Sequence, residues 1–161
     1  MRTAILAAAA ALALAAGTAP AAEYESDREG YYYPEIGSQE DFTRSLGQPP
    51  AVPGRGVRTA FITQVTKGQL AAPETPPFVI FAKGAEAEHM IIVATEDGVF
   101  RTLYRARAVL AQLTANARGT EFFVKNGIQS EATWFDLAKL LGFEDLVISD
   151  GASWSHRVVF E

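Results

Sequence analysis

Two continuous apolar runs stand near the middle of the chain, at residues 78–83 and 89–95. Each run has the length of a β-strand, and a run without polar alternation is typical of a central strand that is covered on both faces. The residues between the two runs are few enough to form a hairpin. We therefore expect two antiparallel neighbours in the middle of a sheet.

A helical spacing follows at residues 102–117, where apolar side chains recur at intervals of three and four residues. This spacing places them on one stripe of an amphipathic helix. Gly119 is a natural stop signal for such a helix. The stripe that we expect to pack against the sheet consists of Leu103, Ala106, Leu110, Leu113 and Ala117.

Three weaker patterns surround this centre. Residues 57–66 mix apolar and polar positions in a way that predicts a half-buried strand. Residues 120–126 predict a second, short helix that ends at an Asn-Gly pair. Residues 133–142 begin with Thr-Trp-Phe-Asp, a capping-box pattern with Asp in place of Glu, and end in Gly, so they predict a third helix.

Two apolar runs near the end of the chain, at residues 146–148 and 157–160, predict a final pair of strands joined by a turn at Asp150-Gly151. The complete pattern predicts one α+β domain over residues 55–161. We expect its sheet to have four or five mainly antiparallel strands and to pack against two or three helices.

The N-terminus has the layout of a secretory signal peptide. Arg2 is followed by an apolar run of Ala and Leu over residues 3–16, and then by small residues that end in Ala21 and Ala22. The apolar run is shorter than the roughly 20 residues that span a bilayer. We therefore predict a signal peptide at residues 1–22, cleavage after Ala21 or Ala22, a periplasmic or secreted protein, and no stable membrane insertion after cleavage.

Residues 23–54 form an acidic arm followed by a linker rich in Pro and Gly. Residues 23–41 hold seven acidic side chains against one basic side chain, so we expect this segment to be partly disordered. The arm also carries Tyr31, Tyr32 and Tyr33, which a purely solvating tail would not need. These tyrosines either dock on the protein's own domain or bind an unknown protein partner.

The overall composition excludes several classes of function. A formal net charge of −5 provides no general attraction for nucleic acid or for an anionic membrane. The absence of cysteine excludes disulfides, thiolate metal sites, iron–sulfur clusters and a cysteine nucleophile. The composition thus leaves carboxylates, hydroxyls, imidazoles and basic groups as candidate chemistry.

The two histidines give no complete site by sequence. His89 follows two glutamates in a Glu-x-Glu-His run, but adjacent strand residues point to opposite faces, so we expect a solvated histidine rather than a metal ligand. His156 follows Ser153 and Ser155, which share the other face of a strand, so no Ser–His pair is supplied locally. A Gly-x-Ser-x-Gly elbow is also absent. We therefore predict no catalytic residue, no metal ligand and no cofactor.

The turn acids Glu144, Asp145 and Asp150 leave two interpretations open, either ordinary surface turns or a carboxylate pair with a weak calcium site.

A group of basic side chains also has two interpretations. Arg101, Arg105 and Arg107 lie in or next to the long predicted helix. Arg101 and Arg105 share one face of that helix and could clamp an anion. The alternative, which we prefer, is that these arginines pair with the acidic arm. Either way they form the candidate anion or partner surface.

Several short runs resemble a small family of exported alphaproteobacterial proteins commonly labelled molybdopterin-guanine dinucleotide biosynthesis protein A. They are Tyr32-Tyr33-Pro34, residues 78–88, Leu-Tyr-Arg-Ala-Arg-Ala at 103–108, and Ile-Ser-Asp-Gly at 148–151. The label implies a cytoplasmic transferase that joins GMP from GTP to molybdopterin, with magnesium, on a Rossmann-like fold. The glycine-rich nucleotide loop of that transferase, Leu-x-Gly-Gly-x-Ser-x-Arg-Met-Gly, has no counterpart in this chain.

The sequence therefore leads to two hypotheses about function. The first is an exported, non-enzymatic binding or interaction protein that meets its partner through the tyrosine-containing arm. The second is a molybdenum-cofactor biosynthesis or nucleotide-binding accessory that uses the surface of Arg101 and Arg105.

Overall fold

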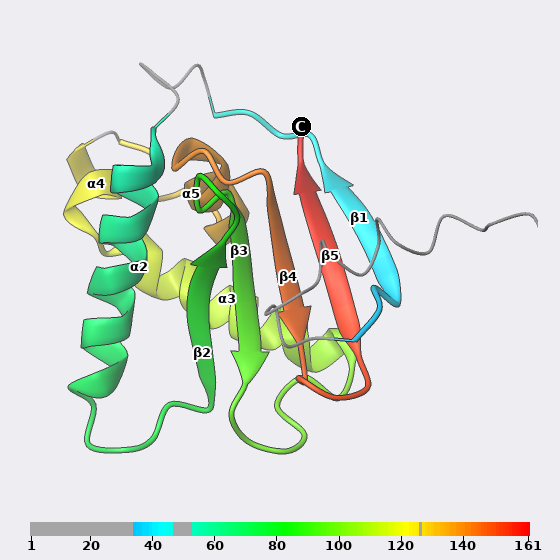
Figure 1. The fold of residues 1–161 in the computed structure, drawn as a ribbon. Helices are drawn as coiled ribbons and strands as arrows, with labels where there is room; N and C mark the ends of the chain where they lie inside the picture. Colours follow the sequence, from blue (N-terminus) through cyan, green and yellow to red (C-terminus); the bar gives the residue numbers. More distant parts are fainter. Residues whose placement is uncertain (1–33, 47–52, 126) are drawn as a thin grey trace, which may run out of the picture.

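A computed structural model describes residues 34–46, 53–125 and 127–161, without the side chains of residues 121 and 122. Figure 1 shows the arrangement of its helices and strands. The predicted signal peptide, its predicted cleavage site, Tyr31–Tyr33 and most of the linker lie outside the described residues, so the predictions for these segments stay predictions. In chain order the elements are β1 (Ser38–Phe42), α2 (Arg55–Leu70), β2 (Phe78–Lys83), β3 (His89–Ala94), α3 (Leu103–Arg118), α4 (Glu121–Lys125), α5 (Trp134–Leu140), β4 (Asp145–Ser149) and β5 (Ser155–Phe160).

The five strands form one mixed sheet in the order β1-β5-β4-β3-β2. The pairs β2/β3 and β4/β5 are antiparallel hairpins, as the sequence predicts. The pairs β3/β4 and β1/β5 are parallel. The α+β class, the strand count and the single small domain are confirmed, and the sheet is mixed rather than mainly antiparallel. A parallel pair needs a long crossover connection, and the helices between β3 and β4 supply it.

The helices α3 and α5 match the expected patterns closely. The Thr102 side chain caps α3 by accepting a hydrogen bond from the backbone N–H of Arg105. At α5, the Thr133 hydroxyl accepts from the backbone N–H of Asp136, and the Asp136 carboxylate accepts from the backbone N–H of Thr133. This reciprocal pair is the predicted capping box.

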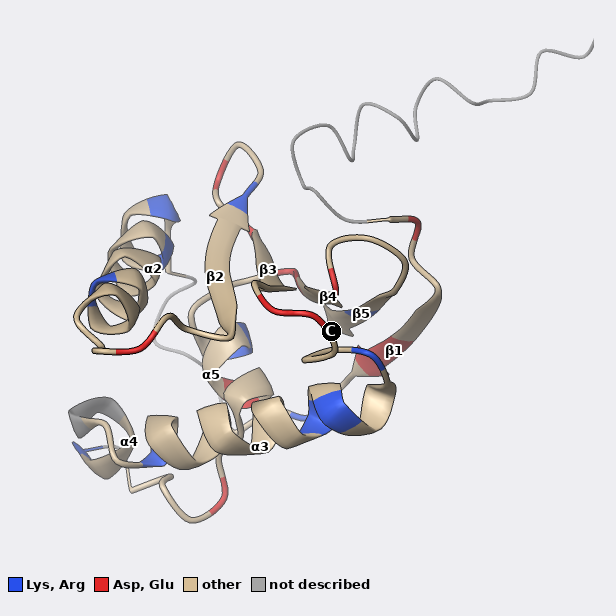
Figure 2. Cartoon of the chain, turned by 90° about the horizontal axis from the view of Figure 1, so that it is seen from below, with Lys and Arg blue, Asp and Glu red and all other residues tan. Residues whose placement is uncertain are grey.

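The hydrophobic core lies between the sheet and the helices. Figure 2 shows α3, α4 and α5 on one side of the sheet. The fully or almost fully buried members of this core come from both layers, and burial of each large side chain contributes about 1.5–3 kcal/mol. From the sheet they are Ile80, Met90, Ile92, Leu146, Ile148 and Val158, and from the helices and loops Phe100, Ala106, Leu113, Ala117, Phe123, Trp134 and Leu137. Within the described residues, no helix is long and apolar enough to cross a membrane.

The predicted strand at residues 57–66 is wrong, because this segment lies inside the helix α2. Its apolar residues Phe61, Ile62 and Val65 pack against the core at a spacing of one and four residues. That spacing suits one face of a helix, although β-branched residues also favour strands. The sequence pattern favours a helix and a strand here almost equally, and packing against the core selects the helix.

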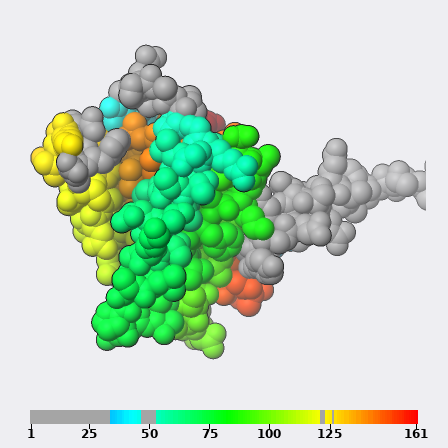
Figure 3. All heavy atoms as spheres, turned by 60° about the vertical axis from the view of Figure 1, so that its left-hand side comes forward, coloured from blue at the N-terminus to red at the C-terminus, as the bar shows by residue number. Residues whose placement is uncertain are grey.

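The positions of two strands also differ from the prediction. The strand β2 lies at an edge of the sheet instead of in its middle, and α2 packs beside it. Figure 3 shows α2 forming a ridge along this side of the molecule. The strand β1 comes from the acidic arm and forms the opposite edge, with Ser38 paired to His156 and Phe42 paired to Phe160. Charged, mostly exposed residues suit a sheet edge, where they discourage pairing with other chains.

One buried arginine holds α2 to the rest of the domain. Arg58 is only 5% exposed. Its guanidinium donates twice to the carbonyl of Glu86, at 3.0 and 2.7 Å, and once each to the carbonyls of Pro53, at 2.6 Å, and Gly142, at 3.0 Å. These partners belong to the segment before α2, the β2–β3 turn and the turn after α5, so one side chain joins three separate segments.

Replacement of Arg58 by Ala is expected to lower the free energy of unfolding by about 3 kcal/mol, because the charge-assisted bonds to three carbonyls are lost together. Urea unfolding of the purified protein measures this change. The matched control is Arg55→Ala on the same helix, where the side chain is exposed. Arg58→Lys should recover only part of the loss, because one ammonium cannot reproduce the planar fork. Equal stabilities of Arg58→Ala and Arg55→Ala would contradict this account.

Candidate functional site

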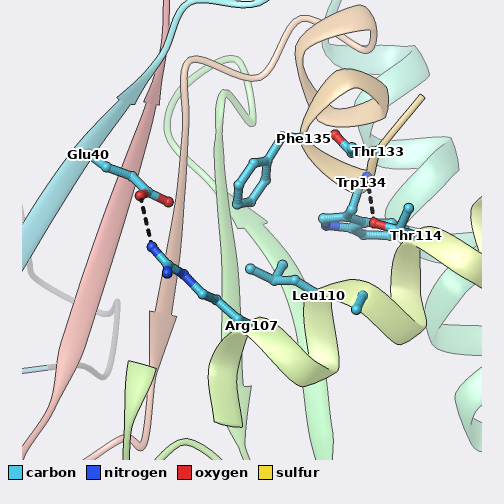
Figure 4. A pocket seen from close by; sticks show the side chains of 8 residues that line it. Glu40, Arg107, Leu110, Thr114, Thr133, Trp134 and Phe135 are labelled. Atoms are coloured by element: carbon cyan, nitrogen blue, oxygen red, sulfur yellow. Dashed lines mark hydrogen bonds and ion pairs between the residues drawn. The ribbon is translucent and has the colours of Figure 1, made fainter. Parts of the chain in front are cut away.

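A small cleft opens between the edge strand β1 and the helices α3 and α5 (Figure 4). Its cavity volume is about 180 Å³. We call it the β1–α3–α5 cleft, and it is lined by Glu40, Arg107, Leu110, Ala111, Thr114, Thr133, Trp134 and Phe135. Four of these residues come from α3 at spacings of three, one and three, so they share one face of that helix.

The interior of the β1–α3–α5 cleft is mainly apolar. The Thr114 hydroxyl accepts a hydrogen bond of 3.0 Å from the backbone N–H of Trp134, which joins α3 to the start of α5. Trp134 is only 5% exposed, and its indole Nε1 has no hydrogen-bond partner among the described residues. A buried donor without a partner is costly. Because this nitrogen is buried, the indole ring forms a closed part of the cleft wall.

The aromatic side of the cleft is held by a small cluster of rings. Phe135 meets Phe42 of β1 in an edge-to-face contact with ring centroids 5.3 Å apart, and its ring lies 6.2 Å from that of Phe160 in β5. Such contacts add stability beyond simple burial. The cluster fixes the orientation of the Phe135 ring that lines the cleft, and it couples α5 to the edge of the sheet.

A pair of opposite charges stands at the rim of the cleft. The guanidinium of Arg107 lies 3.7 Å from Oε2 of Glu40, and both side chains are substantially exposed. An exposed pair at this distance is weak, because water screens it and holding two long side chains costs entropy. The other oxygen of Glu40 lies 3.5 Å from Nε2 of His156, which is 4% exposed. Figure 4 shows Glu40 and Arg107 reaching toward each other from β1 and α3.

The ring of His156 also meets a serine. Its Nδ1 lies 2.8 Å from the hydroxyl of Ser38, and Trp154 stacks against the ring with centroids 6.3 Å apart. The sequence offered Ser153 and Ser155 as neighbours, whereas strand pairing supplies Ser38 and Glu40. In a serine hydrolase the hydroxyl faces the substrate and the carboxylate stands behind the histidine. Here Glu40 lines the cleft and Ser38 does not, so the arrangement suits the attachment of β1 to β5 better than nucleophilic attack.

The three arginines singled out in the sequence do not act together. Arg105 donates a hydrogen bond to the carbonyl of Gly98, in the loop before α3. Arg107 turns toward Glu40, and Arg101 is exposed just before α3. The structure thus brings only Arg107 to the cleft. Its contact with Glu40 is an ion pair between the long helix and the acidic arm, of the kind that the preferred interpretation expects.

A second polar cluster lies on the opposite face of the sheet. The buried carboxylate of Asp145 accepts hydrogen bonds from Arg157, and its Oδ2 lies 3.1 Å from Nδ1 of His89. The interaction with Asp145 raises the pKa of His89 above 6.5, although partial burial opposes it. Burial also acts to raise the pKa of Asp145, but His89 and Arg157 outweigh it and lower that pKa. Among the described residues, no group of three histidines or acids could hold a metal ion.

Asp150 belongs to the turn between β4 and β5. Its Oδ1 accepts hydrogen bonds from the backbone N–H groups of Ala152, Ser153 and Trp154, and its Oδ2 accepts from the Ser153 hydroxyl. Although partial burial acts to raise it, these hydrogen bonds lower the pKa of Asp150 to about 2. This carboxylate therefore shapes the turn.

Comparison with known proteins leaves the site to be interpreted from its own geometry, because no family model, no curated protein and no solved structure matches the chain. The cleft residues Glu40, Thr114, Trp134 and Phe135 were not singled out in the sequence. The only local signal for them is the pair of adjacent aromatic residues at the start of α5, of which one enters the core and the other faces β1.

The His89–Asp145 interaction predicts a pH-dependent stability. The pKa of His89 is raised in the folded state, so protonated His89 stabilises the fold through Asp145. This stabilisation is fully present below the unfolded-state pKa of 6.5 and is lost as pH rises through the folded-state pKa of His89. His89→Gln should therefore lower the free energy of unfolding at about pH 5.5 more than at about pH 9. Denaturant unfolding across this range measures the difference. A pH-independent effect of His89→Gln would contradict the interaction, and Asp145→Asn should abolish the dependence.

Proposed function

We propose that this chain is an exported, non-enzymatic binding protein whose ligand occupies the β1–α3–α5 cleft. The observation that carries the proposal is an apolar interior, closed by Leu110, Trp134 and Phe135, beneath a weak pair of opposite charges. Ligand sites combine these same two parts, apolar walls that provide affinity and a few polar groups that provide orientation.

Two observations support binding rather than catalysis. The hydroxyls of Thr114 and Thr133 in the cleft wall are engaged in hydrogen bonds that hold and cap α5, so they are poor candidates for nucleophiles. The remaining charged groups, Arg107 and Glu40, face each other and are exposed at the rim. Such a pair can hold a ligand by its charges, and the Glu40 carboxylate lies at the exposed rim, where it suits an ion pair better than proton transfer to a buried reacting atom.

The alternative function, a molybdenum-cofactor biosynthesis or nucleotide-binding accessory, requires a different site. A cleft of about 180 Å³ is smaller than the roughly 300–1,000 Å³ of pockets that take drug-sized ligands such as nucleotides. The alternative therefore rests on Arg101 and Arg105, outside the cleft. A contribution of the tyrosine-containing arm to partner binding is a further part of the main proposal, and it too is separate from the cleft.

Filling the cleft tests the main proposal. Ala111 lines the cleft and is exposed, so Ala111→Trp should fold normally and block the cavity. Ala108→Trp, on the same helix but outside the cleft lining, is the matched control. Thermal-shift measurements on the mature protein with a panel of small amines, carboxylates, amino acids and nucleotides should reveal compounds that raise the melting temperature of wild type and Ala108→Trp, but not of Ala111→Trp.

The other outcomes of this experiment are also informative. A compound that stabilises all three proteins equally binds outside the cleft and contradicts the proposed site. A nucleotide whose effect disappears in Arg101→Ala and Arg105→Ala would favour the alternative function. A panel that shifts none of the proteins would contradict a small-ligand site in the cleft.

Export is tested by the mature N-terminus. Mass spectrometry of fractionated cells that produce the full chain should find the protein in the periplasm or the medium, beginning at Ala22 or Glu23. The apolar run before Ala19 should be missing from that species. Recovery of an unprocessed chain that begins at Met1 and stays in the cytosol would contradict the export part of the proposal.

A further inference from the structure

The rim of the β1–α3–α5 cleft presents one positive and one negative group side by side. The distance from the Arg107 guanidinium nitrogen to Oε2 of Glu40 is 3.7 Å, which is longer than a normal hydrogen bond. The side chain of Arg107 is 63% exposed and that of Glu40 is 39% exposed. Little is therefore lost when a ligand replaces this contact with shorter ones that it also shields from water.

A free α-amino acid carries the complementary groups. Its carboxylate and ammonium are attached to one carbon, so they can meet a guanidinium and a carboxylate that lie close together. An arginine fork binds a carboxylate with two parallel hydrogen bonds, and a carboxylate accepts hydrogen bonds from an ammonium. Neighbouring charges of opposite sign thus match both charged groups of a zwitterion. A ligand with only a carboxylate would leave Glu40 without a ligand group, and a ligand with only an amine would leave Arg107 without one.

We propose that the cleft binds a free α-amino acid with an apolar side chain, an inference that rests on the proposed function. The ligand carboxylate binds Arg107, its ammonium binds Glu40, and its side chain enters the apolar interior between Leu110 and Phe135. The cavity volume of about 180 Å³ suits a molecule well below drug size.

The walls of the cleft favour an apolar side chain. The Thr114 hydroxyl already accepts a hydrogen bond from the backbone N–H of Trp134, and the ring of Phe135 is held in place by Phe42. A polar side chain would lose water without regaining hydrogen bonds, which is unfavourable.

The anchoring of Glu40 supports the same assignment. One carboxylate oxygen faces Arg107 while the other lies 3.5 Å from the ring of His156. The other ring nitrogen of His156 contacts the hydroxyl of Ser38, which lies two residues before Glu40 on β1. Pairing of β1 with β5 places the backbone of Glu40 opposite Val158, so Glu40 stays at the rim when Arg107 turns to a ligand carboxylate, and its own carboxylate is available for the ammonium.

Three related probes test the two charges separately. Isothermal titration calorimetry of the mature protein uses L-phenylalanine, phenylacetate, which lacks the ammonium, and phenethylamine, which lacks the carboxylate. We expect L-phenylalanine to bind at least about tenfold more tightly than either analogue, since each charge-assisted contact is worth that much or more.

Two variants complete the test. Arg107→Ala should weaken L-phenylalanine and phenylacetate about tenfold or more and leave phenethylamine unchanged. Glu40→Gln should weaken L-phenylalanine and phenethylamine to a similar extent, while phenylacetate binds equally or more tightly. The matched controls are Arg105→Ala on α3 and Asp41→Asn on β1, which lie outside the cleft lining. Circular dichroism melting curves of all four variants identify any loss that comes from unfolding.

The results that overturn the inference differ from those that overturn the proposed function. Binding of phenylacetate or phenethylamine as tight as that of L-phenylalanine, or affinities insensitive to Arg107→Ala and Glu40→Gln, would exclude the amino-acid assignment. The binding function would still stand if Ala111→Trp abolished that binding. If none of the three probes binds measurably to the folded wild-type protein, the amino-acid assignment is also rejected. The cleft would then remain a binding site if a different compound from the panel stabilised wild type but not Ala111→Trp.

Discussion

The parallel pairing of β3 with β4 is the constraint on which the rest of the fold depends. It places Met90 beside Leu146 and Ile92 beside Ile148, and all four side chains are almost completely buried. Two parallel neighbours cannot be joined by a tight turn, so the chain must cross over between the two ends of the sheet. The helices α3, α4 and α5 form this crossover, and their place on one side of the sheet follows from it (Figure 2).

The cleft forms where this helical layer meets the edge strand β1. α3 and α5 are in contact with each other, and β1 adds the fifth strand at the edge. β1 is held by backbone hydrogen bonds from Gly37 to Ser155 and from Glu161 to Phe42, as well as by the contact between Ser38 and His156. A segment that precedes the linker therefore provides the acidic half of the rim, while the crossover provides the basic half and the apolar interior.

The two faces of the sheet use ionisable groups in different ways. On the face away from the core, the buried carboxylate of Asp145 is compensated by Arg157 and His89, as a charge removed from water must be. At the cleft, the charges of Glu40 and Arg107 are exposed and only loosely paired. The first arrangement stabilises one conformation of the sheet. The second leaves charge available at the surface, which is the property that we assign to a ligand site.

What the sequence by itself determined are the elements whose signals are local. The spacing of Leu and Ala specified α3, the Thr133–Asp136 capping box specified the start of α5, and the apolar runs specified β2 to β5. Only the tertiary structure decided the rest. It turned residues 57–66 into part of α2, moved β2 to an edge, recruited Ser38–Phe42 as β1 and brought Glu40 to Arg107. The physical reason is that capping and periodicity act within a few residues, whereas strand neighbours and cleft walls are set by burial and pairing between segments far apart in the chain.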